Sequence, residues 1–357
     1  MEEELFLVDH ASLELSHTAS DVLPRVRARE GTVMHDTYEA MLETASPVVR
    51  NAHEGAAALA ACREDIRSAG ATLLGAGLHP TADFGDAVHV PLERYREVYA
   101  QMRGLLRRTP TCAIHIHVGM PDPETAILAC NRVRAHLPVL QGLAAHSPYW
   151  HGLDPEFETA RAQAWRAYPP AVIPRAFESW EDYLELVDAV TAAGGLPDYT
   201  FLWWDVRPHP KLGTLEVRAM DAQSRLTSVL GLAALTHALV VRAAHEDDGP
   251  VPEVEVLTQS SYRAGRDGLR STIWSGGALR PFAEVARATL DLARPYARDA
   301  GAEDALEEVE RILADGNGAE RMRANHANGG MPAVLAALVE ETAEPLVSPA
   351  RAEAAGD

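Results

Sequence analysis

The stretch at residues 200–221 reads TFLWWDVRPHPKLGTLEVRAMD and contains two runs of aromatic, β-branched and aliphatic residues. Each run, at residues 200–206 and 213–221, has the composition of a strand. Between them, residues 208–211 (PHPK) carry two prolines, which favour a turn and not a crossover to a parallel strand. The two strands are therefore expected to form an antiparallel hairpin.

The remaining segments extend this hairpin to a prediction for the whole fold. Further strands are expected at residues 2–9, 38–47, 71–78 and 111–120, and helices at residues 48–69, 92–108, 123–145 and 180–193. Residues 147–175 are rich in proline and aromatic residues and predict a long structured loop, and nearly all of the chain from Arg225 onward has a helical pattern. Hairpin-joined strands with segregated helices predict an α+β fold with an antiparallel sheet.

The composition of the 357-residue chain excludes several classes of protein. Hydrophobic residues make up 47% and charged residues 24%, which are ordinary values for one or two globular domains. Acids exceed bases, 52 − 32 = 20, and the formal net charge of −20 disfavours binding to nucleic acid or anionic membranes. The sequence contains no GxGxxG, GxxxxGKS/T, GxSxG or HExxH motif, so Rossmann, P-loop, esterase and zincin folds lack sequence support.

Cysteine usage and the apolar runs predict a cytoplasmic protein. Cys62, Cys112 and Cys130 form no CxxC pair, and three cysteines are too few for a disulfide framework. The acidic residues 2–4 are unlike the basic start of a signal peptide. The longest nearly apolar run, at residues 225–242, falls short of the roughly 20 residues of a membrane span and predicts a buried helix.

Residues 111–120 (TCAIHIHVGM) alternate strictly, as one strand with a buried face does. One face carries the apolar side chains of Cys112, Ile114, Ile116 and Val118. The other face presents His115 and His117 side by side. Two solvent-facing histidines are the simpler alternative, but histidine is uncommon at strand centres, and a shared face favours a functional role.

The same alternation test groups acidic residues on two other predicted strands. Glu2 and Glu4 share a face at one end of the first strand, where a frayed acidic start is the alternative. Glu216 and Arg218 share a face of the 213–221 strand, either as a solvated ion pair or as a metal ligand beside an anion-binding guanidinium. Each pair alone is ambiguous, and together they indicate a charged site on the sheet.

Two further carboxylates are candidates for this site. Glu43 interrupts an apolar stretch, and Asp36 lies seven residues before it. Seven residues share a face on a helix but not on a strand, so periodicity does not unite the two. Oxygen-rich ligand sets of this kind suit Mg²⁺ or Mn²⁺ better than Zn²⁺, and two such ions commonly bind nucleotide phosphates.

Several motifs in chain order carry a family resemblance. They are EEELFLVD at 2–9, YEAMLET at 38–44, GLHP at 77–80, HIHVG at 115–119, SPYWHG at 147–152, LWWDVRPHP at 202–210 and GTLEVR at 213–218. In this order they resemble the motifs of the type 2 glutamate–cysteine ligase family, also called carboxylate–amine ligases. The resemblance extends from residue 2 to residue 268 and thins over the C-terminal helices.

The resemblance implies a fold and a reaction. The fold would be glutamine synthetase-like: a curved antiparallel β-sheet holding ATP and divalent ions, with helices packed behind it and a helical C-terminal part. In the implied reaction, ATP phosphorylates a carboxylate, typically the γ-carboxylate of L-glutamate, and an amine such as L-cysteine attacks the acyl phosphate. The expected partners are small-molecule substrates, without nucleic acid or membrane, and a homodimer is left open.

The resemblance also implies roles for residues of this chain. The metal ligands would be Glu2, Glu4, Asp36, Glu43 and Glu216, holding Mg²⁺ or alternatively Mn²⁺. His115 would contact metal or phosphate, and Arg218 would stabilise the transferred phosphoryl group. His117, Arg207 and Arg266 would bind the nucleotide.

The sequence departs from the family pattern at three places, one of which is LHPT at 78–81, where the family commonly has Thr-His-Pro-Phe. The glycine and valine that precede the acidic triplet are absent, so the natural start is expected a few residues upstream of Met1. Ser260 and Tyr262 stand where the family often has asparagine and tryptophan, which leaves the substrates open. Residues 1–345 are expected to form a single catalytic domain, and residues 346–357 a disordered tail.

Two other functions compete with the ligase. A metal-dependent hydrolase could use the HxH strand, but it would require a βα-repeat barrel with transition-metal ligands on later strands. A non-catalytic nucleotide or metabolite binder could retain the same fold. The hairpin order and the surplus of carboxylates favour the ligase over the hydrolase.

Overall fold

The computed structural model describes residues 1–169, 171–247 and 249–346. Within them, a seven-stranded sheet has only antiparallel neighbours. Its strands are β1 (Glu2–Val8), β2 (Thr32–His35), β3 (Met41–Ala45), β4 (Thr72–Leu74), β5 (Ala113–Gly119), β6 (Val206–His209) and β7 (Thr214–Asp221). They follow the order β2-β3-β1-β5-β7-β6, and β4 pairs with the far end of β1. The predicted α+β fold with an antiparallel sheet is confirmed.

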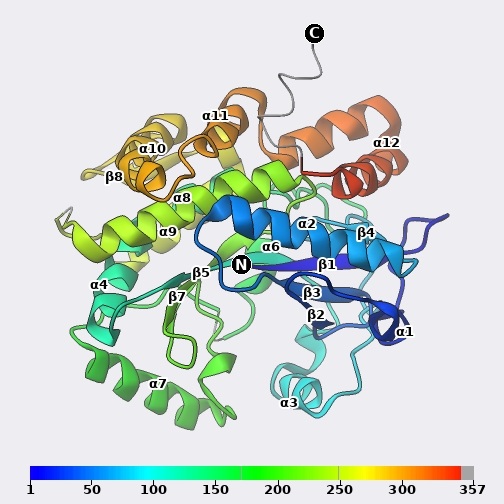
Figure 1. Cartoon of the computed structure of the whole chain (residues 1–357), viewed down its shortest axis with the longest axis horizontal. Coiled ribbons are helices and arrows are strands. Elements are labelled where there is room, and N and C mark those ends of the chain that lie inside the picture. The colour runs from blue at the N-terminus through cyan, green and yellow to red at the C-terminus, as the bar shows by residue number, and fades with distance from the viewer. Residues whose placement is uncertain (170, 248, 347–357) are drawn as a thin grey trace.

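Helices make up much of the rest of the described chain (Figure 1). They are α1 (Ala19–Val22), α2 (Ala52–Ser68), α3 (Glu93–Met102), α4 (Pro123–Val133), α5 (Leu137–Leu143), α6 (Ala160–Trp165), α7 (Trp180–Gly194), α8 (Leu226–His245), α9 (Val254–Asp267), α10 (Phe282–Asp299), α11 (Leu306–Asp315) and α12 (Gly318–Ala343). Short 3₁₀ turns lie at Leu23–Arg25, Arg103–Leu105, Arg134–His136, Tyr199–Phe201 and Gly268–Arg270. In Figure 1, α2 and α8 lie on one side of the sheet, and α3 and α7 flank the opposite side.

The long helix α8 forms the centre of the main hydrophobic core. It packs against α2, α4, α10 and α11 and against β5 of the sheet. By length and composition α8 could cross a membrane, but 78% of its most apolar window is buried inside the protein. The prediction of a buried helix over residues 225–242 is therefore confirmed.

The strands alternate between a face that packs on helices and a face that lines a cavity. On β7, Leu215 and Val217 join the core cluster under α8, and Glu216 and Arg218 point to the cavity. On β5, the apolar residues pack in the same core, and His115 faces the cavity. The two faces predicted for these strands are confirmed within the strands, and they separate apolar packing from charged chemistry. The face predicted for Cys112 is wrong: β5 begins only at Ala113, and Cys112 packs in a second cluster with Phe6 and Val8.

The first strand of the 200–221 hairpin was predicted in the wrong place. Tyr199–Phe201 form a 3₁₀ turn, because the Asp198 side chain accepts a hydrogen bond from the backbone N–H two residues on (2.7 Å). Strand β6 begins only at Val206 and includes two of the residues assigned to the turn. The turn itself lies nearer Gly213, whose φ of +63° suits glycine.

Two strand regions were not predicted. Strand β2 pairs with β3 at the edge of the large sheet. Within the supposedly helical C-terminal part, β8 (Thr272–Ser275) and β9 (Ala278–Pro281) form a separate hairpin. Gly276 and Gly277 join them with φ of +58° and +81°, a conformation that glycine adopts readily. The Gly-Gly dipeptide was the overlooked signal of this hairpin.

Two predictions about chain organisation remain untested. The single domain over residues 1–345 stays a prediction. The tail expected at residues 346–357 lies, except for Leu346, outside the described residues.

Candidate active site

A cavity of about 280 Å³ opens on the sheet face opposite the main helical core. The strands supply most of its charged lining: Glu2 and Glu4 from β1, Glu43 from β3, His115 and His117 from β5, Arg207 and His209 from β6, and Glu216 and Arg218 from β7. Asp36, which directly follows β2, lines the same cavity. Side chains from five strands therefore meet in one small space.

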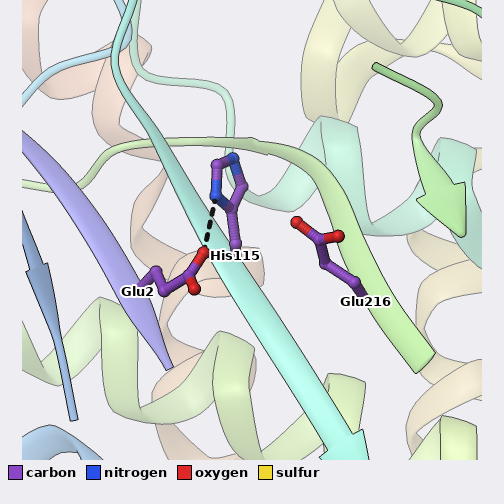
Figure 2. Close-up of side chains that lie close together, drawn as sticks. All are labelled: Glu2, His115 and Glu216. Atoms are coloured by element: carbon purple, nitrogen blue, oxygen red, sulfur yellow. Dashed lines mark hydrogen bonds and ion pairs between the residues drawn. The ribbon is translucent and has the colours of Figure 1, made fainter. Parts of the chain in front are cut away.

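Glu2, His115 and Glu216 form the tightest cluster (Figure 2). One ligand atom from each lies within 4.8 Å of the others. Glu2 and His115 are direct partners in the β1–β5 ladder, and His115 Nδ1 lies 3.3 Å from Glu2 Oε2. Burial and the nearby Arg218 charge lower the pKa of His115 to about 4, so its imidazole is neutral at pH 7. A neutral imidazole beside two carboxylates can bind a metal ion.

Two arginines hold Glu216 in its charged form. Arg207 Nε donates a hydrogen bond to Glu216 Oε2 (2.6 Å), and Arg218 donates to Oε1. Burial opposes the charged carboxylate, but the charges of Arg218 and Arg207 lower the pKa of Glu216 well below its ordinary value. Arg218 has one buried nitrogen, Nε, that makes no hydrogen bond. Glu216 thus fixes an arginine that retains a donor for an anionic group.

The remaining carboxylates of the cavity, Glu4, Asp36 and Glu43, repel one another. Burial and the Asp36 carboxylate raise the pKa of Glu4 to about 8. Burial and the neighbouring carboxylates of Glu2, Asp36 and Glu4 raise the pKa of Glu43 well above its ordinary value, and burial raises that of Asp36. Bound cations would relieve this repulsion, so the donor set fits divalent ions that prefer oxygen.

His117 has an imidazole nitrogen available to a ligand. Its Nδ1 lies 3.0 Å from Thr214 Oγ1, which orients the ring. Its Nε2 is buried and makes no hydrogen bond, although Glu2 Oε2 lies 3.3 Å away and Glu216 Oε1 3.7 Å away. A nitrogen in this position can contact a metal ion or a phosphate oxygen.

Comparison with known families places the chain as a whole. The sequence profile of the family described as glutamate-cysteine ligase family 2 matches residues 1–340. The chain belongs to this family. The family resemblance drawn from the motifs is therefore confirmed.

Several curated proteins are similar to this member of the family. A Rubrobacter xylanophilus protein provisionally named glutamate–cysteine ligase 2-1 is 35% identical over 352 residues, covering 96% of this chain and 94% of its own. A protein of Halobacterium salinarum named glutamate–cysteine ligase is 35% identical over 289 residues, covering 75% of this chain and 78% of its own.

Two solved structures share the fold of this family member. A bifunctional glutathione synthetase from Pasteurella multocida aligns with a TM-score of 0.66 at 14% identity, over 96% of this chain and 51% of that chain. A glutamate–cysteine ligase from Francisella tularensis, solved in complex with AMP, aligns with a TM-score of 0.65 at 12% identity, over 98% and 89%. At these identities the likeness concerns the fold.

The structure brings together all but one of the predicted site residues. Nine of them line the cavity: Glu2, Glu4, Asp36, Glu43, His115, His117, Arg207, Glu216 and Arg218. Arg266 is not among the lining residues; it lies on α9 with its side chain 40% exposed and pairs with Asp267. The sequence placed Arg266 by its motif position only, and the fold directs that helix elsewhere.

The cavity also has an aromatic wall that was not predicted from the sequence. Trp165, Tyr168 and Trp203 line the cavity with ring centroids 5.2–5.4 Å apart. Arg161 lies over Trp165, and its buried Nε makes no hydrogen bond. The aromatic loop at 147–175 was the available signal. Of the two adjacent tryptophans, Trp203 lines the cavity and Trp204 packs in the core.

Helix α3 also contributes residues that were not predicted. Tyr95 OH donates to the backbone oxygen of His35 (2.7 Å), and Arg94 donates to Thr200 Oγ1 (3.0 Å). Both α3 residues line the cavity. The helix therefore connects the β2 side of the cavity with the segment before β6, and nothing in its own sequence signals this position.

The three cysteines are free and buried, and none lines the cavity. Burial raises the pKa of the Cys62 and Cys130 thiols to about 12, and that of Cys112 well above its ordinary value. These thiols are therefore poor nucleophiles.

Proposed function

We propose that this ATP-dependent ligase joins the γ-carboxylate of L-glutamate to the amino group of an amine such as L-cysteine. The formation of a carbon–nitrogen bond follows from membership of the family. The proposal of these two substrates rests on the cavity in which carboxylates, a neutral histidine and arginines converge. Side chains of these kinds can bring two anions, a nucleoside triphosphate and a carboxylate, into contact.

The proposed reaction has two steps. A γ-carboxylate oxygen of glutamate attacks the terminal phosphorus of ATP, and the bond between this phosphorus and the bridging oxygen breaks to release ADP. The neutral amine then attacks the acyl carbon, phosphate leaves, and the amine nitrogen loses one proton. No protein nucleophile is required, which agrees with the buried and protonated thiols.

The acidic side chains would hold the divalent ions. Glu2, Glu216 and His115 could share one ion, and Glu4, Glu43 and Asp36 a second. When bound, Mg²⁺ or Mn²⁺ would neutralise and polarise the phosphates of ATP.

The remaining polar groups would bind the nucleotide phosphates. Arg218 offers an unsatisfied guanidinium nitrogen to the transferred phosphoryl group, and His117 offers Nε2 to a neighbouring oxygen. Arg207 would act through Glu216, whose carboxylate it holds.

The aromatic end of the cavity would receive an amino-acid substrate. Arg161 is buried there with a free Nε, and its guanidinium also lies 3.6 Å from Asp221. An arginine held in this way can bind a carboxylate with its remaining donors. The flat faces of Trp165 and Trp203 would pack against the aliphatic part of the substrate.

The setting of the enzyme completes the proposal. Free, buried cysteines support a cytoplasmic location. The net charge of −20 supports small-molecule substrates over nucleic acid or anionic membranes as partners. A homodimer is consistent with the commonest assembly of soluble enzymes.

The decisive experiment is an ADP-release assay with Mg-ATP over a panel of amino-acid carboxylates and amines, with mass detection of the product. We expect ADP and an amide product with L-glutamate and an amine, and neither with Glu216→Gln. Failure of every substrate pair, together with failure to bind ATP, would refute the ligase.

The two alternative functions fare differently. The hydrolase required a βα-repeat barrel, and the described sheet is antiparallel throughout. The non-catalytic binder predicts ATP binding without ADP formation, so the same assay separates it from the ligase.

A further inference from the structure

The middle residue of the acidic triplet, Glu3, has no place in the cavity. Alternation along β1 directs Glu2 and Glu4 into the cavity and Glu3 to the opposite face. There Glu3 is fully buried, with an exposed fraction of 0%. A buried carboxylate without a partner is costly, so the residue that pairs with it has a defined task.

That partner is Arg63 of α2, which is itself 2% exposed. Arg63 Nε donates to Glu3 Oε2 (3.0 Å), and one Nη donates to Oε1. The other Nη hydrogens go to backbone oxygens of Gln223 (2.8 Å), Ser224 (2.6 Å) and Thr342 (3.3 Å). One guanidinium therefore joins β1 to α2, to the segment after β7 and to the end of α12.

The strand that carries the cation ligands is held unequally by its two neighbours. Residues 2–6 of β1 all pair with β3, but the ladder between β1 and β5 contains only the pairs Glu2–His115 and Glu3–Ile114. On the cavity side, Glu4 lies directly opposite Glu43 in the β1–β3 ladder, and both carboxylates share the cavity with Glu2, so like charges crowd this part of β1. Repulsion between these carboxylates would push β1 out of position. The Glu3–Arg63 fork opposes such a movement from the opposite face of the strand.

Stability alone does not account for the pair. A buried ion pair seldom stabilises a fold more than apolar side chains of the same volume would. Its distinctive property is geometric, because a two-point guanidinium fork fixes both distance and orientation. Residues behind metal ligands commonly control affinity in this way.

We propose that Glu3 and Arg63 are positioning residues, which hold Glu2 and Glu4 at the spacing that divalent-cation binding requires. This inference rests on the cation site of the proposed function. It assigns a task to the one acid of the triplet that cannot reach the cavity.

The test measures binding of Mn²⁺ alone, by electron paramagnetic resonance, in wild type, Glu3→Gln and Arg63→Lys. The matched control is Asp65→Asn on the same helix. Asp65 is a buried carboxylate that accepts a hydrogen bond from Arg29 Nε (2.6 Å) and does not line the cavity. Melting temperatures are recorded for all four proteins.

We expect Mn²⁺ affinity to fall about tenfold or more in both test variants, and to stay at the wild-type value in Asp65→Asn. Activity should return toward the wild-type kcat at saturating Mn²⁺. Unchanged Mn²⁺ binding in a folded Glu3→Gln or Arg63→Lys protein would overturn the proposal, and so would an equal loss in the control. If Glu3→Gln does not fold, Glu3→Asp takes its place in the same comparison. Wild type that binds Mn²⁺ but forms no amide would refute the proposed function and leave the positioning role standing.

Discussion

His115 Nδ1 lies 3.3 Å from Glu2 Oε2, and the two residues are direct partners in the β1–β5 ladder. Opposed residues of neighbouring antiparallel strands have Cβ atoms about 5 Å apart, so strand register alone brings these side chains together. A slip by one residue would turn Glu2 and Glu4 toward the helices and Glu3 into the cavity. The chemistry of the site therefore depends on the register of β1.

Glu216→Gln should lower kcat about 100- to 1,000-fold, because a neutral amide cannot replace the charge between Arg207 and Arg218. Glutamine keeps the shape of the side chain, so the far-UV circular dichroism should match wild type. Steady-state ADP release is the measurement. Wild-type turnover in the folded variant would contradict the role of Glu216.

Arg218→Lys should lower kcat by about 100-fold or more with little change in KM for glutamate, because lysine lacks the planar fork. Arg266→Ala is the paired comparison. Arg266 is partly exposed on α9 and absent from the cavity lining, so its loss should leave both constants unchanged. A large effect of Arg266→Ala would restore the role that the sequence motif suggested for it.

Divalent-cation binding should strengthen as the pH rises between about pH 6 and pH 9, because metal ligands must be deprotonated. The pKa of Glu4 is raised to about 8 and that of Glu43 is raised well above its ordinary value. The Glu4 carboxyl is therefore protonated at the lower end of this range, and a cation must displace its proton. Calorimetry in buffers of different ionisation enthalpy should detect the released protons. Binding independent of pH, without proton release, would contradict this prediction.

The same Glu4 carboxyl should make the metal-free fold less stable as the pH rises. Its folded pKa of about 8 exceeds its ordinary value of 4.5, so its contribution is present at low pH and is lost as the pH rises through about 8. The melting temperature of wild type in EDTA should therefore fall relative to Glu4→Gln between about pH 5 and pH 9. Adding Mg²⁺ should reduce the difference, because a ligand stabilises the state that binds it. If the melting temperatures of the two proteins change in parallel with pH, the pKa of Glu4 is not raised in the folded protein.

Arg161→Met should raise KM for L-cysteine or L-glutamate about tenfold or more, because one charge-assisted hydrogen bond to the substrate carboxylate is lost. Comparison with cysteamine and with 4-aminobutyrate, which lack the respective carboxylates, identifies which substrate Arg161 contacts. The analogue that lacks the contacted group should show the same KM in variant and wild type. If KM is unchanged for every substrate, Arg161 serves the fold and not recognition.

Much of the candidate site was predictable because it lies on strands. Alternation assigns Glu2, Glu4, His115, Glu216 and Arg218 to shared faces within each strand, and the structure keeps those faces. Alternation within one strand could not predict the position of Asp36 relative to Glu43, because Asp36 follows β2 and Glu43 lies on β3. The β2–β3 register, in which Met34 faces Glu43, brings that segment to the cavity.

Other parts of the fold failed prediction for local reasons. The 3₁₀ turn at Tyr199–Phe201 replaces a predicted strand because one aspartate side chain caps the backbone there. The aromatic wall and Arg161 come from a loop and a short helix, where no period relates one residue to the next. Arg266 matched a motif, yet no residue of its helix α9 is among those that line the cavity.

Motif order and local periodicity were enough to predict the family, the antiparallel class of the sheet and the faces on which the acids and histidines lie. Which faces meet, how far apart their atoms lie and which charges lack a partner became apparent from the three-dimensional arrangement. Distances between strands depend on register and packing across long separations in sequence. The pairing of Glu3 with Arg63, 60 residues apart, is a clear instance, since no local pattern relates the two.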